Sequence, residues 1–160
     1  MSASASDPKP RLAFLTRVVR KECRHLLTTD QRLFDQPFSA ERAETLEADP
    51  DLAERVEAFV GRFGRLQDTV GDKLLPALLA ALGETPGPAI DNLDRAERLG
   101  WVDSAETWMA MRKLRNQMVY EYVEDPALLS SALETTHGYV PRLIAIAERL
   151  ASEAQGRGWV

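Results

Sequence analysis

The chain has 160 residues and a formal net charge of −5, which excludes a general-purpose nucleic-acid coat protein, because such proteins are basic overall. Hydrophobic residues make up 44% of the chain and charged residues 28%, and these ordinary globular proportions exclude disorder of the whole chain. A chain of this length is expected to form one domain with a buried core.

The sequence predicts a cytoplasmic protein that does not enter a membrane. Its single cysteine, Cys23, excludes an internal disulfide and fits a reducing compartment. No apolar run approaches the roughly 20 residues that a membrane span needs, and no signal-peptide pattern precedes Arg11.

Residues 1–10 are small, polar and proline-containing, and we expect them to form a disordered N-terminal segment. A single helical domain is expected over residues 11–153. Its first helix is predicted from about Pro10 to Leu27, or at its longest to Phe34, and a short helix from about Ser39 to Glu47. Apolar residues follow one side of the first helix at Leu12, Leu15, Val19, Cys23 and Leu26.

A long helix is predicted to begin at Asp49 and Pro50. The aspartate suits the N-cap, and the proline suits the first helical position, where its missing N–H costs nothing. Gly83 can end the helix in a left-handed conformation, and Pro76 should kink or divide it. Apolar residues recur every three or four positions, at Val56, Phe59, Phe63, Leu66, Val70, Leu74 and Leu78.

A short helix is predicted from about Ala89 to Leu99, ended by Gly100. Asp103 and Glu106 then resemble a capping box that opens another long helix. This helix should end near Asp125, because a proline disfavours helix for the residue before it.

The last helix is predicted from Pro126 to about Glu153, with Gly138 and Pro141 bending or interrupting it. Residues 154–160 are expected to form a loose tail that docks through Trp159. Together the elements predict an all-α fold, a bundle of four main helices in antiparallel, up-down order with short accessory helices.

A charged residue interrupts the apolar stripe of the helix predicted over residues 103–125. Met111, Arg115 and Met118 are spaced four and three residues apart and share one face, on which Tyr122 follows. Arg115 therefore stands where an apolar residue would normally contact a neighbouring helix. An unpaired buried charge is very costly there, so the guanidinium needs a partner or a wet cleft.

Asp68, and Asp72 one turn further along the preceding long helix, are candidate partners of this arginine. A buried ion pair between the two helices would be a purely structural interpretation of Arg115. A local basic patch is also predicted, formed by Arg112, Lys113 and Arg115 and extended by Arg62 and Arg65.

Asn116 and Tyr120 are one helical turn apart, so both can face one cleft, and Arg112 precedes them on the same ridge. Taken singly, Tyr120 and Tyr122 fit ordinary aromatic packing with a hydroxyl at the surface. An arginine, an asparagine and two tyrosines within eight residues favour a site.

The stretch "RNQMVYEY", Arg115 to Tyr122, resembles the signature of HEPN domains, in particular the HepT-like members. In that family an arginine, commonly followed by asparagine, is separated by four residues from a His-x-Tyr group. Arg115, Asn116 and Tyr122 match this pattern, but Tyr120 stands in place of the histidine. The resemblance implies an all-α homodimer whose motif helices line a shared cleft, and a metal-independent endoribonuclease in the active members.

The resemblance implies roles for the motif residues. Arg115 would bind phosphate, because a guanidinium recognises it in a planar, bidentate manner, and Asn116 would position the substrate. Tyr120 would stand where the acid–base group belongs, yet a phenol with a pKa of about 10 is a poor base at neutral pH. Losing that group typically costs about 10² to 10⁴ in rate, so a weakened or lost ribonuclease activity is expected.

Many HepT-like domains act with a small nucleotidyltransferase in a toxin–antitoxin-type module, and in some systems that partner adenylylates the motif tyrosine, which corresponds to Tyr122. Three hypotheses stay open. The chain is an RNA- or nucleotide-binding partner of such an enzyme, an active endoribonuclease toxin in which Tyr120 or another group replaces histidine, or a structural dimeric bundle in which Arg115 only pairs with Asp68.

No cofactor or metal is expected. His25 and His137 are far apart in the sequence, and neither "HxxxH" nor "CxxC" occurs. Both histidines fit ordinary surface or helix-end positions. His137 could replace the missing motif histidine only by folding back against it, and nothing near it in the sequence supports that.

Overall fold

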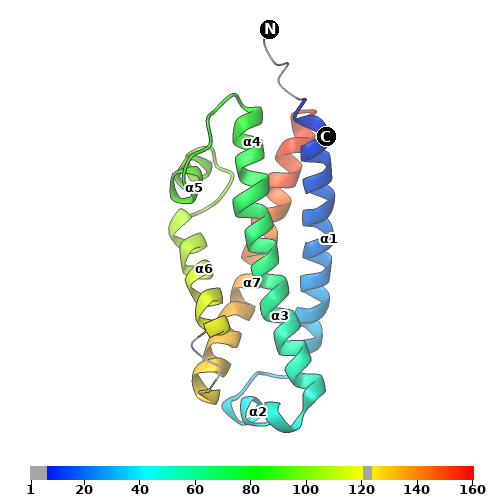
Figure 1. Cartoon of the computed structure of the whole chain (residues 1–160), viewed down its shortest axis with the longest axis vertical. Helices are drawn as coiled ribbons and strands as arrows, with labels where there is room; N and C mark the ends of the chain where they lie inside the picture. Colours follow the sequence, from blue (N-terminus) through cyan, green and yellow to red (C-terminus); the bar gives the residue numbers. More distant parts are fainter. Residues whose placement is uncertain (1–6, 121–123) are drawn as a thin grey trace.

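The computed structural model describes residues 7–120 and 124–160. Its helices are α1 Lys9–Leu33, α2 Ala40–Glu44, α3 Pro50–Thr69, α4 Leu75–Ala81, α5 Ala89–Arg98, α6 Ala105–Tyr120 and α7 Pro126–Gly156. Four long rods, namely α1, α3 continued by α4, α6, and α7, run antiparallel in up-down order, and α2 and α5 lie at opposite ends (Figure 1). The described ranges contain no strand. The predicted all-α bundle is thus confirmed.

Two of the long helices begin at an aspartate followed by a proline, as predicted. The Asp49 carboxylate accepts a hydrogen bond from the Leu52 N–H at 3.1 Å. Asp125 Oδ1 accepts from the N–H groups of residues 127 and 128 at 3.0 and 3.2 Å. Each carboxylate satisfies backbone donors that a helix start leaves unpaired.

The predicted glycine stops are also found. Gly83 follows α4 with φ of 87°, and Gly100 follows α5 with φ of 76°. Both lie in the left-handed region, which a residue without a Cβ reaches at little cost. These two stops turn the chain at the end of the bundle that carries α5.

The start of α6 differs from the prediction by one residue. Ser104 is the capping residue, because its hydroxyl accepts a hydrogen bond from the Thr107 N–H at 3.1 Å. Glu97 of α5 also accepts from the Ala105 N–H at 3.0 Å. A side chain from the preceding helix thus takes part in the cap, and this long-range contact has no signal in the local sequence.

The interruption predicted at Pro76 is a π-helical turn, Val70–Leu74, that joins α3 to α4. The ring of a proline clashes with the carbonyl four residues earlier in a regular α-helix. The wider turn carries the N–H of Leu75 back to the carbonyl of Val70 and lets the rod continue past the proline. The helix changes its winding but does not break.

The interruption expected in the last helix is absent, because α7 runs over 31 residues through Gly138 and Pro141. Both residues are exposed. Water can therefore satisfy the carbonyl of His137, which loses its usual helical donor to the proline, and a glycine three residues before the ring has no side chain to crowd it.

The two ends of the described chain are more ordered than expected. Helix α1 already begins at Lys9, inside the segment expected to be disordered, and residues 1–6 lie outside the described residues. Helix α7 continues to Gly156. Trp159 then donates its backbone N–H to the carbonyl of Ala154 at 2.9 Å and packs, partly buried, against the core. The predicted docking of this tryptophan is confirmed.

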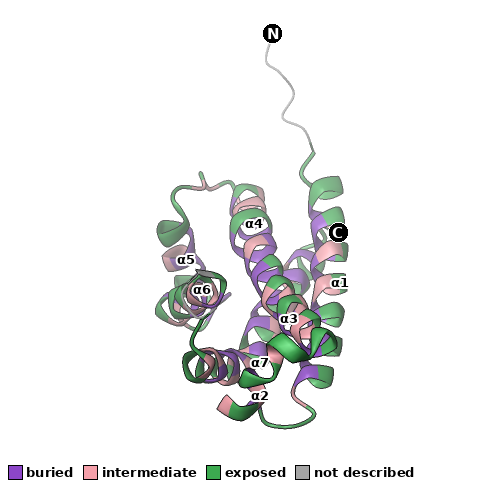
Figure 2. Cartoon of the chain, turned by 60° about the horizontal axis from the view of Figure 1, so that its bottom comes forward, coloured by how far each residue is buried: buried purple, intermediate pink, exposed green. Residues whose placement is uncertain are grey.

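The core lies between α1, α3 and α7, with α6 packed against α3 and α7. Buried residues cover the inward sides of these helices, and exposed residues cover the outward sides (Figure 2). Trp101 and Trp108 extend the core toward α5 and α6. No helix in the described ranges has both the length and the apolar character needed to cross a bilayer.

Helix α6 approaches the π-helical turn after α3 closely at Gly71, where a Cβ would lie 2.8 Å from Cζ2 of Trp108. We expect Gly71→Ala to destabilise the protein by about 1–3 kcal/mol, because the buried indole would have to move. Gly61→Ala is the matched control in α3, since a Cβ there meets nothing within 4 Å, and it should stabilise by about 0.5–1 kcal/mol. Urea unfolding followed by circular dichroism measures both, and equal effects would contradict the close approach.

Candidate functional site

Arg115 reaches from α6 onto α3. Its Nη1 donates to Oδ1 of Asp68 at 2.5 Å. The side chain also lies across Gly64, where a Cβ would come within 2.6 Å of Nε. Because Gly64 and Asp68 are one turn apart on α3, the glycine leaves room for the guanidinium and the aspartate holds it.

A second ion pair lies one turn away. Arg112 Nη1 is 3.6 Å from Asp72 Oδ1. The two arginines are three residues apart on α6, and the two aspartates are four apart, Asp68 on α3 and Asp72 in the π-helical turn that follows it. Because the two segments run antiparallel, the two ion pairs lie one above the other between them. Both predicted partners of Arg115 are therefore used, one by each arginine.

The Arg115–Asp68 pair is wet. The Arg115 side chain keeps 26% of its surface exposed, and the Asp68 side chain keeps 39%. The structural hypothesis predicts a dry contact within one chain, whereas the binding hypothesis predicts that Arg115 and Tyr122 open onto a solvent cleft at a two-fold interface. The structure contains the Arg115–Asp68 contact within one chain, but this contact is partly exposed to solvent and not dry.

The other predicted site residues are placed in part. Asn116 is exposed on α6, next to the paired arginine. Tyr120 is the last described residue of α6, but its side chain lies outside the description, and Tyr122 lies outside the described residues altogether. Of the residues expected to line the cleft, the structure therefore describes the side chains of Arg115 and Asn116 but not those of the two tyrosines.

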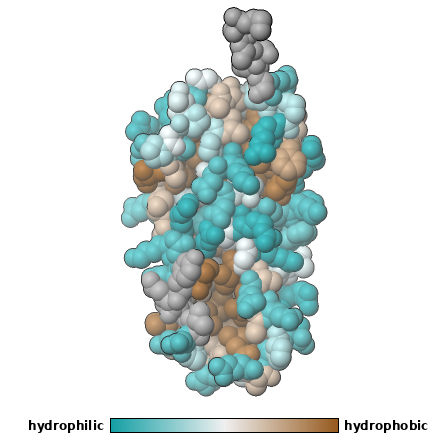
Figure 3. All heavy atoms as spheres, in the orientation of Figure 1, coloured by the Kyte–Doolittle hydropathy of each residue, from teal (hydrophilic) through white to brown (hydrophobic). Residues whose placement is uncertain are grey.

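An apolar groove of about 450 Å³ lies beside these residues, between α3 and the last turns of α6. Met118 and Val119 of α6 form one wall, Val56 and Val60 of α3 another, and Leu129 of α7 closes one end. Figure 3 shows apolar side chains gathered in the lower half of this face, below a band of polar side chains. The candidate site thus combines the two ion pairs of Arg112 and Arg115 with an apolar groove.

The predicted extension of the basic patch by Arg62 and Arg65 is wrong. Arg62 points to α1, where its Nη1 donates to the hydroxyl of Thr29 and to the carbonyl of His25. Arg65 lines a small cavity with Arg62, His25 and Glu22. On the α6 side, each of Arg112 and Arg115 has a carboxylate partner, so their charges are largely compensated there.

Neither histidine contacts a described motif residue of α6, because His25 is part of α1 and His137 of α7 contacts α1. His137 Nδ1 lies 2.6 Å from Asp30 Oδ1, and its ring stacks on Phe34 with 4.1 Å between the ring centroids. His25 lies on α1 beside Arg62. The described side chains therefore bring no histidine to the Arg115 position.

Two other kinds of site that the rest of the described chain could hold are a reactive thiol and a cluster of metal-ligating side chains. Burial raises the pKa of the Cys23 thiol to about 12, with Glu148 and Glu22 adding to the effect, so this cysteine stays protonated and unreactive near neutral pH. No group of three or more metal-ligating side chains occurs among residues 7–120 and 124–160.

One carboxyl group between α1 and α3 has a clearly shifted pKa. Burial raises the pKa of Glu22 above its ordinary value, although a hydrogen bond from the Thr69 hydroxyl and the nearby charge of Arg65 act in the opposite direction. Oε1 accepts that hydrogen bond at 3.1 Å. Oε2 is buried and has no hydrogen-bond partner in the described part of the chain, so ionisation of this group opposes folding.

Comparisons of this chain with protein-family models, with curated proteins and with solved structures find no match. The resemblance to HEPN domains therefore rests on the motif residues and on the order of the helices.

Sequence reasoning missed Gly64 and Gln67 as parts of the α3–α6 contact. Gln67 is buried and donates from Nε2 to the carbonyl of Trp108 at 3.2 Å. The spacing did hold a signal for the glycine, because Gly64 is one turn before Asp68 and shares its face. The partner of Gln67 is 41 residues away in the sequence and has no such signal.

We expect the Arg115–Asp68 pair to contribute a coupling free energy of about 0.5–1 kcal/mol, because partly exposed ion pairs are screened by water. Urea unfolding of the wild type, Arg115→Gln, Asp68→Asn and the double variant measures it. Gly64→Ala should displace the guanidinium and remove most of this coupling, whereas Gly61→Ala should leave it intact. A coupling of zero in the wild-type background would contradict the contact.

We expect Glu22→Gln to stabilise the protein at neutral pH but not in acid. A folded-state pKa above the unfolded value means that the wild type loses stability as pH rises from below the ordinary glutamate pKa of 4.5 through the raised pKa. The glutamine variant lacks this loss and can still accept from Thr69. Its advantage in urea unfolding should therefore grow between about pH 4 and about pH 7, and a difference that stays constant with pH would contradict the assignment.

Proposed function

We propose that this protein is a HEPN-like, cytoplasmic homodimer that binds RNA or a nucleotide beside a small nucleotidyltransferase partner, in a toxin–antitoxin-type module. Its ribonuclease activity is weakened or lost. The observation that carries the proposal is the position of Arg115 and Asn116, which are adjacent on α6, accessible to solvent and next to an apolar groove on the same face.

The placement of the histidines supports binding over cleavage. Cleavage of RNA without a metal needs a group that transfers protons near neutral pH, and histidine is the usual one. His137 is engaged by Asp30 and Phe34, and His25 lies at the α1–α3 contact. A site built on Arg115 and Asn116 then retains groups that hold a phosphate and lacks the usual proton carrier among its described side chains.

The ion pair with Asp68 sets a condition on this function. A bound phosphate has to compete with the carboxylate for the guanidinium, or to approach the N–H groups that face away from it. Arginine carries five N–H donors in a planar fork, so it can contact a carboxylate and a phosphate together. The partial exposure of both side chains leaves room for such a shared arrangement.

The structural hypothesis remains the second candidate, and one observation favours it. Arg115 has a carboxylate partner within its own chain, and that contact satisfies the charge without a ligand. In this case the two stacked ion pairs hold α6 on α3, and the protein has no site on this face.

A gel-shift and cleavage assay with purified protein and a labelled, structured RNA separates these candidates. We expect the RNA to be bound without being cut, and Arg115→Ala to weaken binding by roughly tenfold, since it removes a charge-assisted contact to phosphate. Arg98→Ala is the control, because this arginine is exposed on α5 and its loss changes the net charge equally. Binding that Arg115→Ala leaves unchanged would contradict the proposal.

The same assay tests the remaining alternative. Cleavage that disappears in Arg115→Ala would establish an active ribonuclease, and cleavage that persists in this variant would come from another source. Sedimentation of the wild type checks the expected homodimer. Toxicity on overexpression, relieved by a neighbouring gene for a nucleotidyltransferase, would support the proposed partner.

A further inference from the structure

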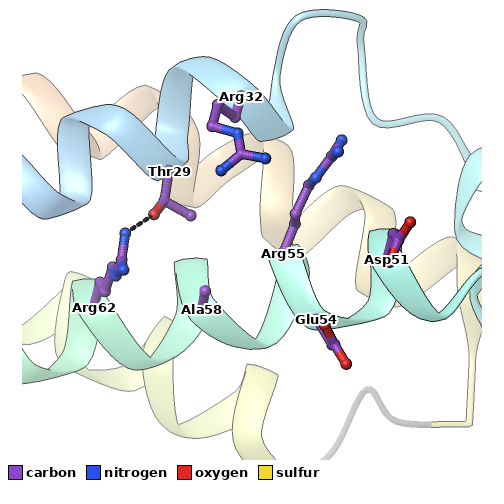
Figure 4. Close-up of a pocket in the computed structure, with 7 residues that line it drawn as sticks. All are labelled: Thr29, Arg32, Asp51, Glu54, Arg55, Ala58 and Arg62. Carbon is purple, nitrogen blue, oxygen red and sulfur yellow. Dashed lines mark hydrogen bonds between the residues drawn. The ribbon is translucent and has the colours of Figure 1, made fainter.

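A second groove, which is polar and has a volume of about 400 Å³, lies between the last turns of α1 and the first half of α3, on a different helix pair from the motif residues (Figure 4). Three arginines reach it, Arg32 from α1 and Arg55 and Arg62 from α3. The mutual repulsion of three like charges opposes packing of the two helices that carry them.

Arg62 is fixed at the inner end of this groove. Its Nη1 donates to the hydroxyl of Thr29 and to the carbonyl of His25. These two contacts hold the guanidinium in one orientation. Its Nε and Nη2 groups make no hydrogen bond within the described residues, so they remain available as donors on a positioned charge.

Arg32 and Arg55 carry charges without acidic partners. Neither forms an ion pair with any carboxylate in the described ranges. Figure 4 shows the two side chains extending into the same space between α1 and α3, whereas Glu54 extends from the other side of the α3 ribbon. Two acidic residues also line the groove, Glu54 and Asp51, and Asp51 lies one turn before Arg55 on α3.

The chemistry of the lining selects the ligand. Guanidinium groups bind tetrahedral oxyanions through paired, charge-assisted N–H donors. No aromatic side chain lines the groove, so it offers no surface on which a nucleic-acid base could stack. Ala58, at the centre of the lining, keeps the floor of the groove clear. The groove is therefore suited to phosphate groups and not to bases.

We propose that Arg32, Arg55 and Arg62 form a phosphate-binding site for a compact, multiply charged phosphate such as a pyrophosphate group. The bound anion compensates three like charges at the α1–α3 contact. The site does not depend on the proposed function of α6, because it uses none of the motif residues and neither of the ion pairs between α3 and α6.

Titration calorimetry of the full chain with inorganic pyrophosphate, at fixed ionic strength, tests this site. The wild type should bind it, and Arg55→Gln and Arg32→Gln should each raise Kd by roughly tenfold, because each removes a charge-assisted contact. Arg17→Gln is the matched control, since it removes the same charge from an exposed position of α1 and should leave Kd unchanged. Circular dichroism melting establishes that each variant is folded.

Two further arms identify the source of the phosphate. A single-stranded oligouridylate should bind more weakly than pyrophosphate and should be displaced by it, and inorganic sulfate at the same ionic strength should bind more weakly than either. Failure of the wild type to bind pyrophosphate would overturn the proposal, as would an equal loss of affinity in Arg17→Gln and Arg55→Gln. Tighter binding of the oligouridylate, sensitive to Arg55→Gln, would overturn the choice of a compact ligand in favour of a phosphodiester backbone.

Discussion

Two glycines allow α6 to lie close to α3 and to the π-helical turn that follows it, and the candidate site lies at this contact. Gly64 receives the side chain of Arg115, and Gly71 receives the ring of Trp108. They are seven residues apart, two helical turns, so they face the same neighbour. A side chain at Gly71 would press on the buried Trp108 ring, and one at Gly64 would displace the Arg115 guanidinium.

The local signals in the sequence predicted the ends of the helices well. The caps at Asp49 and Asp125 and the stops at Gly83 and Gly100 each depend on one residue and its immediate neighbours, so they can be read from a short stretch. The prolines predicted interruptions of the helices less well. Pro76 coincides with a π-helical turn, whereas Pro141 is absorbed by an exposed stretch of α7, and the difference lies in what surrounds each ring.

The candidate site was predictable only in part. Pairing of Arg115 with Asp68 could be anticipated, because a charge on an apolar stripe demands a partner and few carboxylates are available. The contact of His137 with Asp30 spans 107 residues and leaves no trace in local spacing. The side of α3 on which a residue lies was also hard to predict. Arg62 and Arg65 were expected to extend the patch of motif arginines, yet Arg62 hydrogen-bonds to α1 and Arg65 lines a cavity with two α1 residues.

The π-helical turn at Val70–Leu74 also determines which side of α4 faces the core. A widened turn holds one residue more than the regular winding, so everything after it is rotated by about 100° relative to an uninterrupted helix. Leu75, Leu78 and Leu79 are buried in that rotated phase. A chain shortened by one residue inside this turn could wind regularly, but it would then aim these leucines away from α1 and α7. The π-helical turn therefore sets the rotation of α4 about its axis. An insertion or deletion within the turn would expose the leucines that α4 buries.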